Sequence, residues 1–343
     1  MSYQEDLYVY LDEKTNQIVR LLPKFCKTYF NHLKIIGKSQ RTRLQYAYDL
    51  RRFCDYLLDY KMIRKKDFKS SNAKDVLEPI TLEDLQNYVN SLEYSKTNST
   101  TKVLSPSTKA RKISSLKSFF KYYYKIGAID KNPADLLESP KVPDKQLTIL
   151  NRKEISRMLK NISKPTNGLQ MLSLRNYAIA MLFFGTGIRL SELIGIDISD
   201  INFEKSSILV TRKGGDLDVV YFGPEVKDAL KNYIQNGREQ LLNSKSDRNA
   251  LFISKKHRRM SVRAVEEMIS SYAKAAGIEG KVSPHALRRS YGTYLYDVTG
   301  DIFLVSSALH HASIETTRKH YIRMSDNHKK IAAKKSSGLF TKQ

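Results

Sequence analysis

Three side chains near the end of the sequence could together act on a phosphodiester bond. His285 and Arg288 follow Ser283-Pro284, a pair typical of a helix start. A helix would place them on one face of its first turn, where free backbone N–H groups already favour an anion. Tyr321 lies further on, in a segment rich in cations. A tyrosine beside a bound phosphate can act as a nucleophile, although a capped helix with an incidental histidine also explains the pattern.

Two further cationic residues lie much earlier in the chain. Arg189 follows the turn Gly185-Thr-Gly187 after an apolar run, so we expect it near a core yet facing a cleft. Glu192, one helical turn on, could orient it. Lys213 lies at the tip of a predicted hairpin, where an exposed lysine could deliver a proton to a leaving oxygen. A structural ion pair and an inert surface lysine are the competing interpretations.

The charge of the chain favours a polyanionic partner. Lys and Arg number 59 against 35 Asp and Glu, which gives a net charge of +24. Nucleic acid is the commonest partner of such a protein, although a generically basic protein would share this composition. Cys26 and Cys54 have no metal-ligand or disulfide spacing, and the histidines near Tyr321 have no carboxylate or thiolate at ligand spacing. We therefore predict no metal and no cofactor.

The sequence has no signal peptide and no apolar run long enough to span a membrane. We therefore expect no membrane partner and a bacterial, cytoplasmic location.

Residues 21–138 predict a small helical bundle. Apolar and aromatic residues recur there at helical spacing, whereas residues 1–20 form a short polar extension and 95–101 a polar, flexible segment. Two prolines near Ser139 break the pattern, so 139–147 is the predicted linker. Basic residues recur at two helix starts, which favours contact with DNA phosphates over a merely solvated face. These candidates are Arg41, Arg43, Lys109, Arg111, Lys112 and Lys117.

Residues 148–325 predict a second domain, mostly helical with a small antiparallel sheet. Its centre is the strongly apolar helix Leu172–Phe184. β-Branched runs on either side of Lys213-Gly-Gly indicate a hairpin. The remaining predicted elements are helices that start at Asn151, Gly223-Pro224, Ser261 and Ser283, and a brief strand over 251–254.

Taken together, these residues occur in the order of one family. They are Arg189 in Thr-Gly-Ile-Arg-Leu-Ser-Glu-Leu, Lys213 in Arg-Lys-Gly-Gly, His285 and Arg288 in His-Ala-Leu-Arg, then His311 and Tyr321. In this order the chain resembles the tyrosine recombinases, which include Xer recombinases and phage and transposon integrases. The resemblance implies a mainly α fold with a small antiparallel β-sheet: a SAM-like core-binding domain followed by a mixed α/β catalytic domain, the two closing around DNA as a C-shaped clamp.

The resemblance also implies a mechanism that needs no metal or ATP. Tyr321 attacks the scissile phosphate and forms a 3′-phosphotyrosine. The other roles are a phosphate clamp by Arg189 and Arg288, hydrogen bonding and proton acceptance by His285 and His311, protonation of the 5′ oxygen by Lys213, and orientation of the clamp by Glu192.

One position departs from the family pattern. The family usually has Leu-Gly-His before the tyrosine helix, whereas this chain has Leu309-His310-His311. Either histidine could contact the phosphate, and we assign His311. The departure favours a mobile-element enzyme for integration or excision, with Xer-like dimer resolution as the alternative. A catalytically silent DNA-binding protein of the same fold and a type IB topoisomerase are the rivals from other classes.

The resemblance further implies the partners. We expect double-stranded DNA with paired inverted binding sites and a homo-tetramer on synapsed DNA, formed from a chain that is monomeric when free in solution. Residues 326–343 are basic but include Ile331, Leu339 and Phe340. We predict that this tail docks on a neighbouring subunit.

Overall fold

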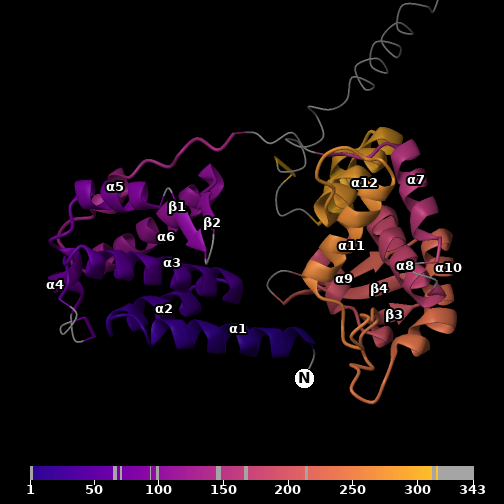
Figure 1. The fold of residues 1–343 in the computed structure, drawn as a ribbon, viewed down its shortest axis with the longest axis horizontal. Coiled ribbons are helices and arrows are strands. Elements are labelled where there is room, and N and C mark those ends of the chain that lie inside the picture. Colours follow the sequence, from indigo (N-terminus) through magenta and orange to yellow (C-terminus); the bar gives the residue numbers. More distant parts are fainter. Residues whose placement is uncertain are drawn as a thin grey trace, which may run out of the picture. The chain divides into compact units, whose positions relative to one another are not determined.

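The computed structural model describes residues 3–64, 68–69, 72–92, 94–97, 100–143, 148–165, 169–212, 215–310 and 314–315. The chain divides into two compact units, residues 1–145 and 146–343 (Figure 1). This division falls within the predicted linker. No helix in these described ranges is long and apolar enough to cross a membrane.

The first unit is a helical bundle with one small hairpin (Figure 1). Its helices begin where side chains cap them: Thr81 and Asp84 form a reciprocal capping box, and Ser105 accepts from Thr108 N ahead of Pro106. The elements are α1 (Tyr3–Val19), α2 (Cys26–Ile35), α3 (Gln40–Asp59), α4 (Ala73–Leu77), α5 (Leu82–Ser91), β1 (Tyr94–Thr97), β2 (Thr100–Val103), α6 (Pro106–Lys125) and η1 (Pro133–Leu136).

Two segments of this unit are more ordered than the sequence predicted. The polar extension is mostly the helix α1, which packs on α3 and buries Leu11 and Val19. The segment expected to be flexible contributes to an antiparallel hairpin, in which β1 pairs with β2 from Tyr94↔Val103 to Thr97↔Thr100. That prediction was wrong because it weighed polarity over β-branching, which favours extended pairing.

Aromatic side chains fill the core of the first unit. Tyr29, Phe119 and Phe120 are at most 2% exposed, and the rings of Tyr29 and Phe119 meet edge to face at 5.1 Å between centroids. Tyr123, from the aromatic run that ends α6, is also buried and donates to the Phe25 carbonyl over 2.7 Å. The bundle therefore has a core of its own.

The second unit surrounds the apolar helix α8, as the sequence predicted, and α7, α10 and α12 pack against it. A three-stranded antiparallel sheet in the order β3-β4-β5 lies beside this core (Figure 1). The elements are α7 (Arg152–Ile162), α8 (Gln170–Thr186), α9 (Leu190–Gly195), η2 (Ile198–Asp200), β3 (Ile201–Asn202), β4 (Ser207–Thr211), β5 (Leu217–Tyr221), α10 (Pro224–Tyr233), η3 (Ile234–Arg238), η4 (Glu239–Leu241), α11 (Val262–Ala275), α12 (Pro284–Thr299) and α13 (Ile302–Ala308).

The strand predicted over residues 251–254 is not formed. Isolated bridges, Asp197↔Ala250 and Ile253↔Arg259, take its place. The buried side chain of Arg238 donates to the Ala250 carbonyl over 2.8 Å and to the Leu251 carbonyl over 3.3 Å. A side chain therefore occupies carbonyls that a partner strand would need.

Candidate active site

Arg189 is positioned by a turn that requires glycine. Helix α8 ends at Gly187, whose φ of +61° is left-handed, and a Cβ there would lie 2.4 Å from the Tyr291 ring. This turn directs the chain into α9, with Arg189 at the N-cap. Its side chain is 29% exposed, so it is held beside the core yet remains accessible.

Arg288 converges on the same place from α12. It is buried, and it donates to the Gly187 and Leu309 carbonyls. Arg189 Nη2 donates to the His310 carbonyl over 2.8 Å and to that of Leu309 over 3.5 Å. The two guanidinium groups thus share the Leu309 carbonyl, although their residues are far apart in the sequence.

Glu192 fixes Arg189 from below the surface. Its carboxylate is 2% exposed and accepts from Arg189 Nη1 over 2.8 Å, from Arg189 N over 2.9 Å and from Arg212 Nη1 over 2.7 Å. Burial by itself raises the pKa of this carboxyl, but the hydrogen bonds from Arg189 and Arg212 outweigh it and hold the pKa below its usual value. Glu192 is therefore ionised, and its hydrogen bonds hold both the side chain and the backbone N–H of Arg189.

A second carboxylate extends this network to the end of α13. Asp218, on β5, accepts from Arg212 Nε over 2.9 Å and lies 2.7 Å from His310 Nδ1. Burial raises the pKa of the Asp218 carboxyl, but the bonds from Arg212 and Val219 N, and the positive charge that His310 carries at the low pH where this carboxyl titrates, lower it overall. Asp218 was not predicted from the sequence as a member of the site, and Arg212 was considered only as a less favoured alternative to Lys213 as the acid. Their signal was a cation and an acid on either side of the predicted hairpin tip.

His285 lies in the first turn of α12 with an exposed side chain. Partial desolvation, together with the positive charges of Arg288 and Arg289, lowers the pKa of its imidazole. At neutral pH the ring is therefore neutral and able to accept a proton. Ser283 occupies the N-cap as predicted, but its side chain makes no capping hydrogen bond; its carbonyl accepts from Ala286 N over 2.8 Å.

Three of the predicted catalytic residues, Lys213, His311 and Tyr321, lie outside the described residues. Their roles stay predictions. Elsewhere, within the part of the chain that the structure describes, no group of three or more His, Cys, Asp or Glu side chains could hold a metal ion.

The predicted DNA contacts divide into two groups. Arg43 is buried against Asp12 at 2.9 Å, and Lys112 is buried against Asp49 at 2.8 Å, where Arg111 also binds. These three cations bind carboxylates within the bundle. The others are Arg41, which is exposed, Lys109, which is half-buried, and Lys117, which is half-buried and whose Nζ donates to the Asp135 carbonyl over 3.3 Å.

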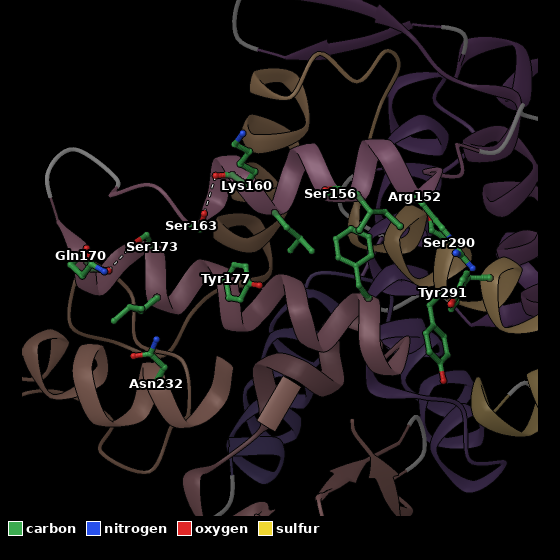
Figure 2. Close-up of a pocket in the computed structure, with 15 residues that line it drawn as sticks. Arg152, Ser156, Lys160, Ser163, Gln170, Ser173, Tyr177, Asn232, Ser290 and Tyr291 are labelled. Carbon is green, nitrogen blue, oxygen red and sulfur yellow. Dashed lines mark hydrogen bonds between the residues drawn. The ribbon is translucent and has the colours of Figure 1, made fainter. Parts of the chain in front are cut away.

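A cavity of about 850 Å³ lies between α7, α8 and α12 (Figure 2). Its walls combine aliphatic and aromatic side chains such as Leu159, Tyr177 and Tyr291. Tyr291 also packs on Gly187, so this wall adjoins the turn that carries Arg189.

Family models match both units. The model described as "Phage integrase family" matches residues 148–328, and "Phage integrase, N-terminal SAM-like domain" matches residues 26–127. The chain is 30% identical to tyrosine recombinase XerC of Thermodesulfovibrio yellowstonii over 314 residues, which cover 88% of this chain and 95% of the relative. It is 29% identical to XerC of Caldanaerobacter subterraneus subsp. tengcongensis, covering 92% and 87%.

Solved structures share the fold. The Tn1549 transposon integrase in complex with a circular intermediate DNA matches with a TM-score of 0.66 and 18% identity, covering 92% of this chain and 99% of that one. XerH site-specific recombinase bound to palindromic difH substrate matches with a TM-score of 0.64 and 22% identity, covering 89% and 84%.

Proposed function

Because this chain is a tyrosine recombinase of the phage integrase family, we propose that it cuts and rejoins specific DNA sites through a covalent bond between Tyr321 and a 3′ phosphate. The observation that carries the proposal is the convergence of Arg189 and Arg288 on one carbonyl, with buried Glu192 orienting the first. Two planar guanidinium groups held this way suit the non-bridging oxygens of a phosphodiester.

In the proposed cleavage step, the assigned residues account for the bond formed, the bond broken and both proton transfers. The Tyr321 oxygen forms a bond to phosphorus while the bond from phosphorus to the 5′ oxygen breaks. His285, neutral because its pKa is lowered, accepts the tyrosine proton, and Lys213 gives a proton to the leaving oxygen. His311 donates to a phosphate oxygen. The acid limb of the cleavage rate against pH should therefore fall below the ordinary pKa of histidine, and His285→Gln should abolish that limb.

We propose that the DNA partner is a duplex with paired inverted sites, bound by both domains, 21–138 and 148–325. Arg41, Lys109 and Lys117 contact its phosphates. Relatives with this fold were solved on DNA, namely XerH on difH substrate and the Tn1549 integrase on a circular intermediate. In our proposal the chain is monomeric when free and tetrameric on synapsed DNA, within the cytoplasm of a bacterium.

The proposed biological role is integration and excision of a mobile element. Substitution of the family glycine by His310 and the fold shared with a transposon integrase support it. Chromosome or plasmid dimer resolution is the second candidate, which the XerC relatives favour. Sequencing the DNA that the protein binds in its host separates the two: element ends support the first role, and a site at a replicon terminus or on a multimeric plasmid supports the second.

A nicked suicide duplex tests the chemistry. Cleavage beside the nick releases a short fragment, so rejoining fails and the covalent adduct accumulates. We expect an adduct that survives SDS with the wild-type chain and none with Tyr321→Phe, which keeps the ring but lacks the nucleophilic oxygen. A wild-type chain that binds the verified site yet gives no adduct would be the silent DNA-binding protein instead.

Residues 326–343 are proposed to dock on a neighbouring subunit. A chain that ends at Asp326 should still bind one site but assemble poorly into tetramers, as measured by light scattering of the DNA complex. Unchanged assembly and recombination would refute this role.

A further inference from the structure

His310 adopts a backbone conformation that disfavours its own side chain. Its φ is +45°, directly after the C-cap Leu309 of α13, and its N–H donates to the Ser307 carbonyl over 2.9 Å. Helices commonly end with glycine at this position, because a Cβ is strained in the left-handed region. A histidine held there is strained, and its surroundings must offset that strain.

The side chain provides such an offset. His310 Nδ1 lies 2.7 Å from Asp218 Oδ2, and Asp218 stands opposite Val210 in the β4–β5 ladder. The contact therefore joins the end of α13 to the hairpin. Lys213 follows Arg212 directly in the sequence of this hairpin.

The contact also closes a ring of interactions. Asp218 binds Arg212, Arg212 binds Glu192, and Glu192 binds Arg189. Arg189 then donates to the His310 carbonyl over 2.8 Å. His310 thus makes two contacts in this ring: its carbonyl accepts from Arg189, and its imidazole contacts Asp218 on the hairpin. Glycine could supply the carbonyl alone.

We propose that His310 is a positioning residue whose hydrogen bond to Asp218 holds the β4–β5 hairpin, and with it Lys213, in register with the Arg189 and Arg288 clamp. This inference rests on the proposed function of Lys213 as the acid that protonates the 5′ oxygen. It gives the histidine at the glycine position a role that does not require it to touch the phosphate.

The charge states suit a lasting contact. Burial and the charges of Arg212 and Arg189 lower the pKa of His310, against the opposing effects of Asp218 and Glu192, so the ring is neutral at neutral pH. Its Nδ1–H then donates to the ionised Asp218 carboxylate. A hydrogen bond to a charged group is stronger than one between neutral groups, so this contact can offset the backbone strain.

The test compares His310→Gly with His257→Gly. His257 is also left-handed, with a φ of +56°, and its Nδ1 makes a 3.0 Å contact to the Leu241 carbonyl, so both variants relieve strain and lose one imidazole contact. Adduct formation is measured in single turnovers at saturating protein. One substrate carries the natural 5′ oxygen, and the other a 5′-bridging sulfur, which leaves without a proton far more readily.

We expect His310→Gly to slow cleavage of the oxygen substrate at least about tenfold, by the loss of one charge-assisted hydrogen bond. Cleavage of the sulfur substrate should stay within about twofold of wild type, since that leaving group no longer depends on the acid. Lys213→Ala should show the same relief more strongly. His257→Gly should resemble wild type on both substrates. Asp218→Ala combined with His310→Gly should cost less than the two single losses together.

Each other outcome overturns the inference. Equal slowing of both substrates by His310→Gly would mean that the residue does not act through the acid. No slowing at all would mean that it positions nothing. If Lys213→Ala is not relieved by sulfur, the acid is another group and the inference falls, while the wild-type adduct still upholds the recombinase chemistry. A wild type without an adduct would reject the proposed function itself.

Discussion

Each unit of this protein buries one carboxylate between two cations, and the two clusters do different work. In the first unit Asp49, from α3, is 1% exposed at its side chain and binds Arg111 and Lys112 of α6. In the second unit Glu192 is 2% exposed and binds Arg189 and Arg212. Three of these four cations, Arg111, Lys112 and Arg189, were predicted from the sequence as phosphate ligands.

The difference lies in what the cations do besides binding the acid. Lys112 is buried, and with Arg111 it joins two helices through Asp49. Arg189 instead uses one nitrogen for Glu192, another for the His310 carbonyl, and remains accessible. A buried carboxylate therefore joins two helices in the first unit, whereas in the second it holds an accessible arginine that we propose binds the phosphate.

The largest effect should come from removing the buried carboxylate of Asp49, which joins α3 to α6. Asp49→Ala leaves the Lys112 charge buried without its partner, so we expect a loss of about 3–5 kcal/mol in the unfolding free energy of the first unit. Urea unfolding followed by circular dichroism measures it. The control is Asp55→Ala on the same helix, whose pair with Arg51 is exposed and worth about 0.5 kcal/mol. Equally small losses of unfolding free energy for the two variants would show that Asp49 does not hold α3 and α6 together.

Removing the Arg189 side chain should affect the rate of DNA cleavage rather than stability. Arg189→Ala removes one of the two residues proposed to clamp the phosphate, and we expect adduct formation to slow by about 10²–10³, as for loss of one oxyanion donor. Stability should change little, because Arg212 still neutralises Glu192, and DNA binding should lose no more than one phosphate contact. The comparison of the two clusters fails if the slow rate is explained by weaker binding or by an unfolded fraction.

Neutralising Glu192, which holds Arg189, should slow cleavage less than removing Arg189. Glu192→Gln keeps the shape but removes the charge, so Arg189 loses its fixed orientation, and we expect adduct formation to slow by about tenfold. The control is Glu154→Gln, which occupies the same capping-box position at the start of α7 but faces solvent. Similar rates for the two variants would show that the buried carboxylate does not direct the clamp.

Much of this arrangement could be predicted from local patterns. The hairpin strands β4 and β5 lie on either side of Lys213-Gly-Gly as predicted, and α8, α10, α11 and α12 begin close to their predicted starts. Caps, prolines and glycine turns specify such boundaries within a few residues of sequence. The contact between Arg189 and Glu192 was predictable because the two residues lie one helical turn apart.

Partners that are distant in the sequence could not be predicted in this way. Arg43 and Lys112 were interpreted as DNA contacts because nothing local shows that Asp12 and Asp49 would fold against them. Asp218 likewise belongs to the site only because the fold brings β5 close to the end of α13, which the local sequence does not show. Tertiary pairing of charges depends on packing, and a basic residue at a helix start looks the same whether it faces DNA or a buried acid.

The smallest effect separates these two kinds of basic residue in one helix. Arg41 is exposed at the start of α3, whereas Arg43 is buried against Asp12. Arg41→Ala should reduce the slope of log binding constant against log salt by about 0.9, the loss of one phosphate contact. Arg43→Ala should leave that slope unchanged and lower stability instead, since it leaves Asp12 without its partner. A reduced slope for Arg43→Ala would mean that Arg43 leaves Asp12 when DNA binds. Arg43 would then pair with a carboxylate in the free protein and with a phosphate in the complex.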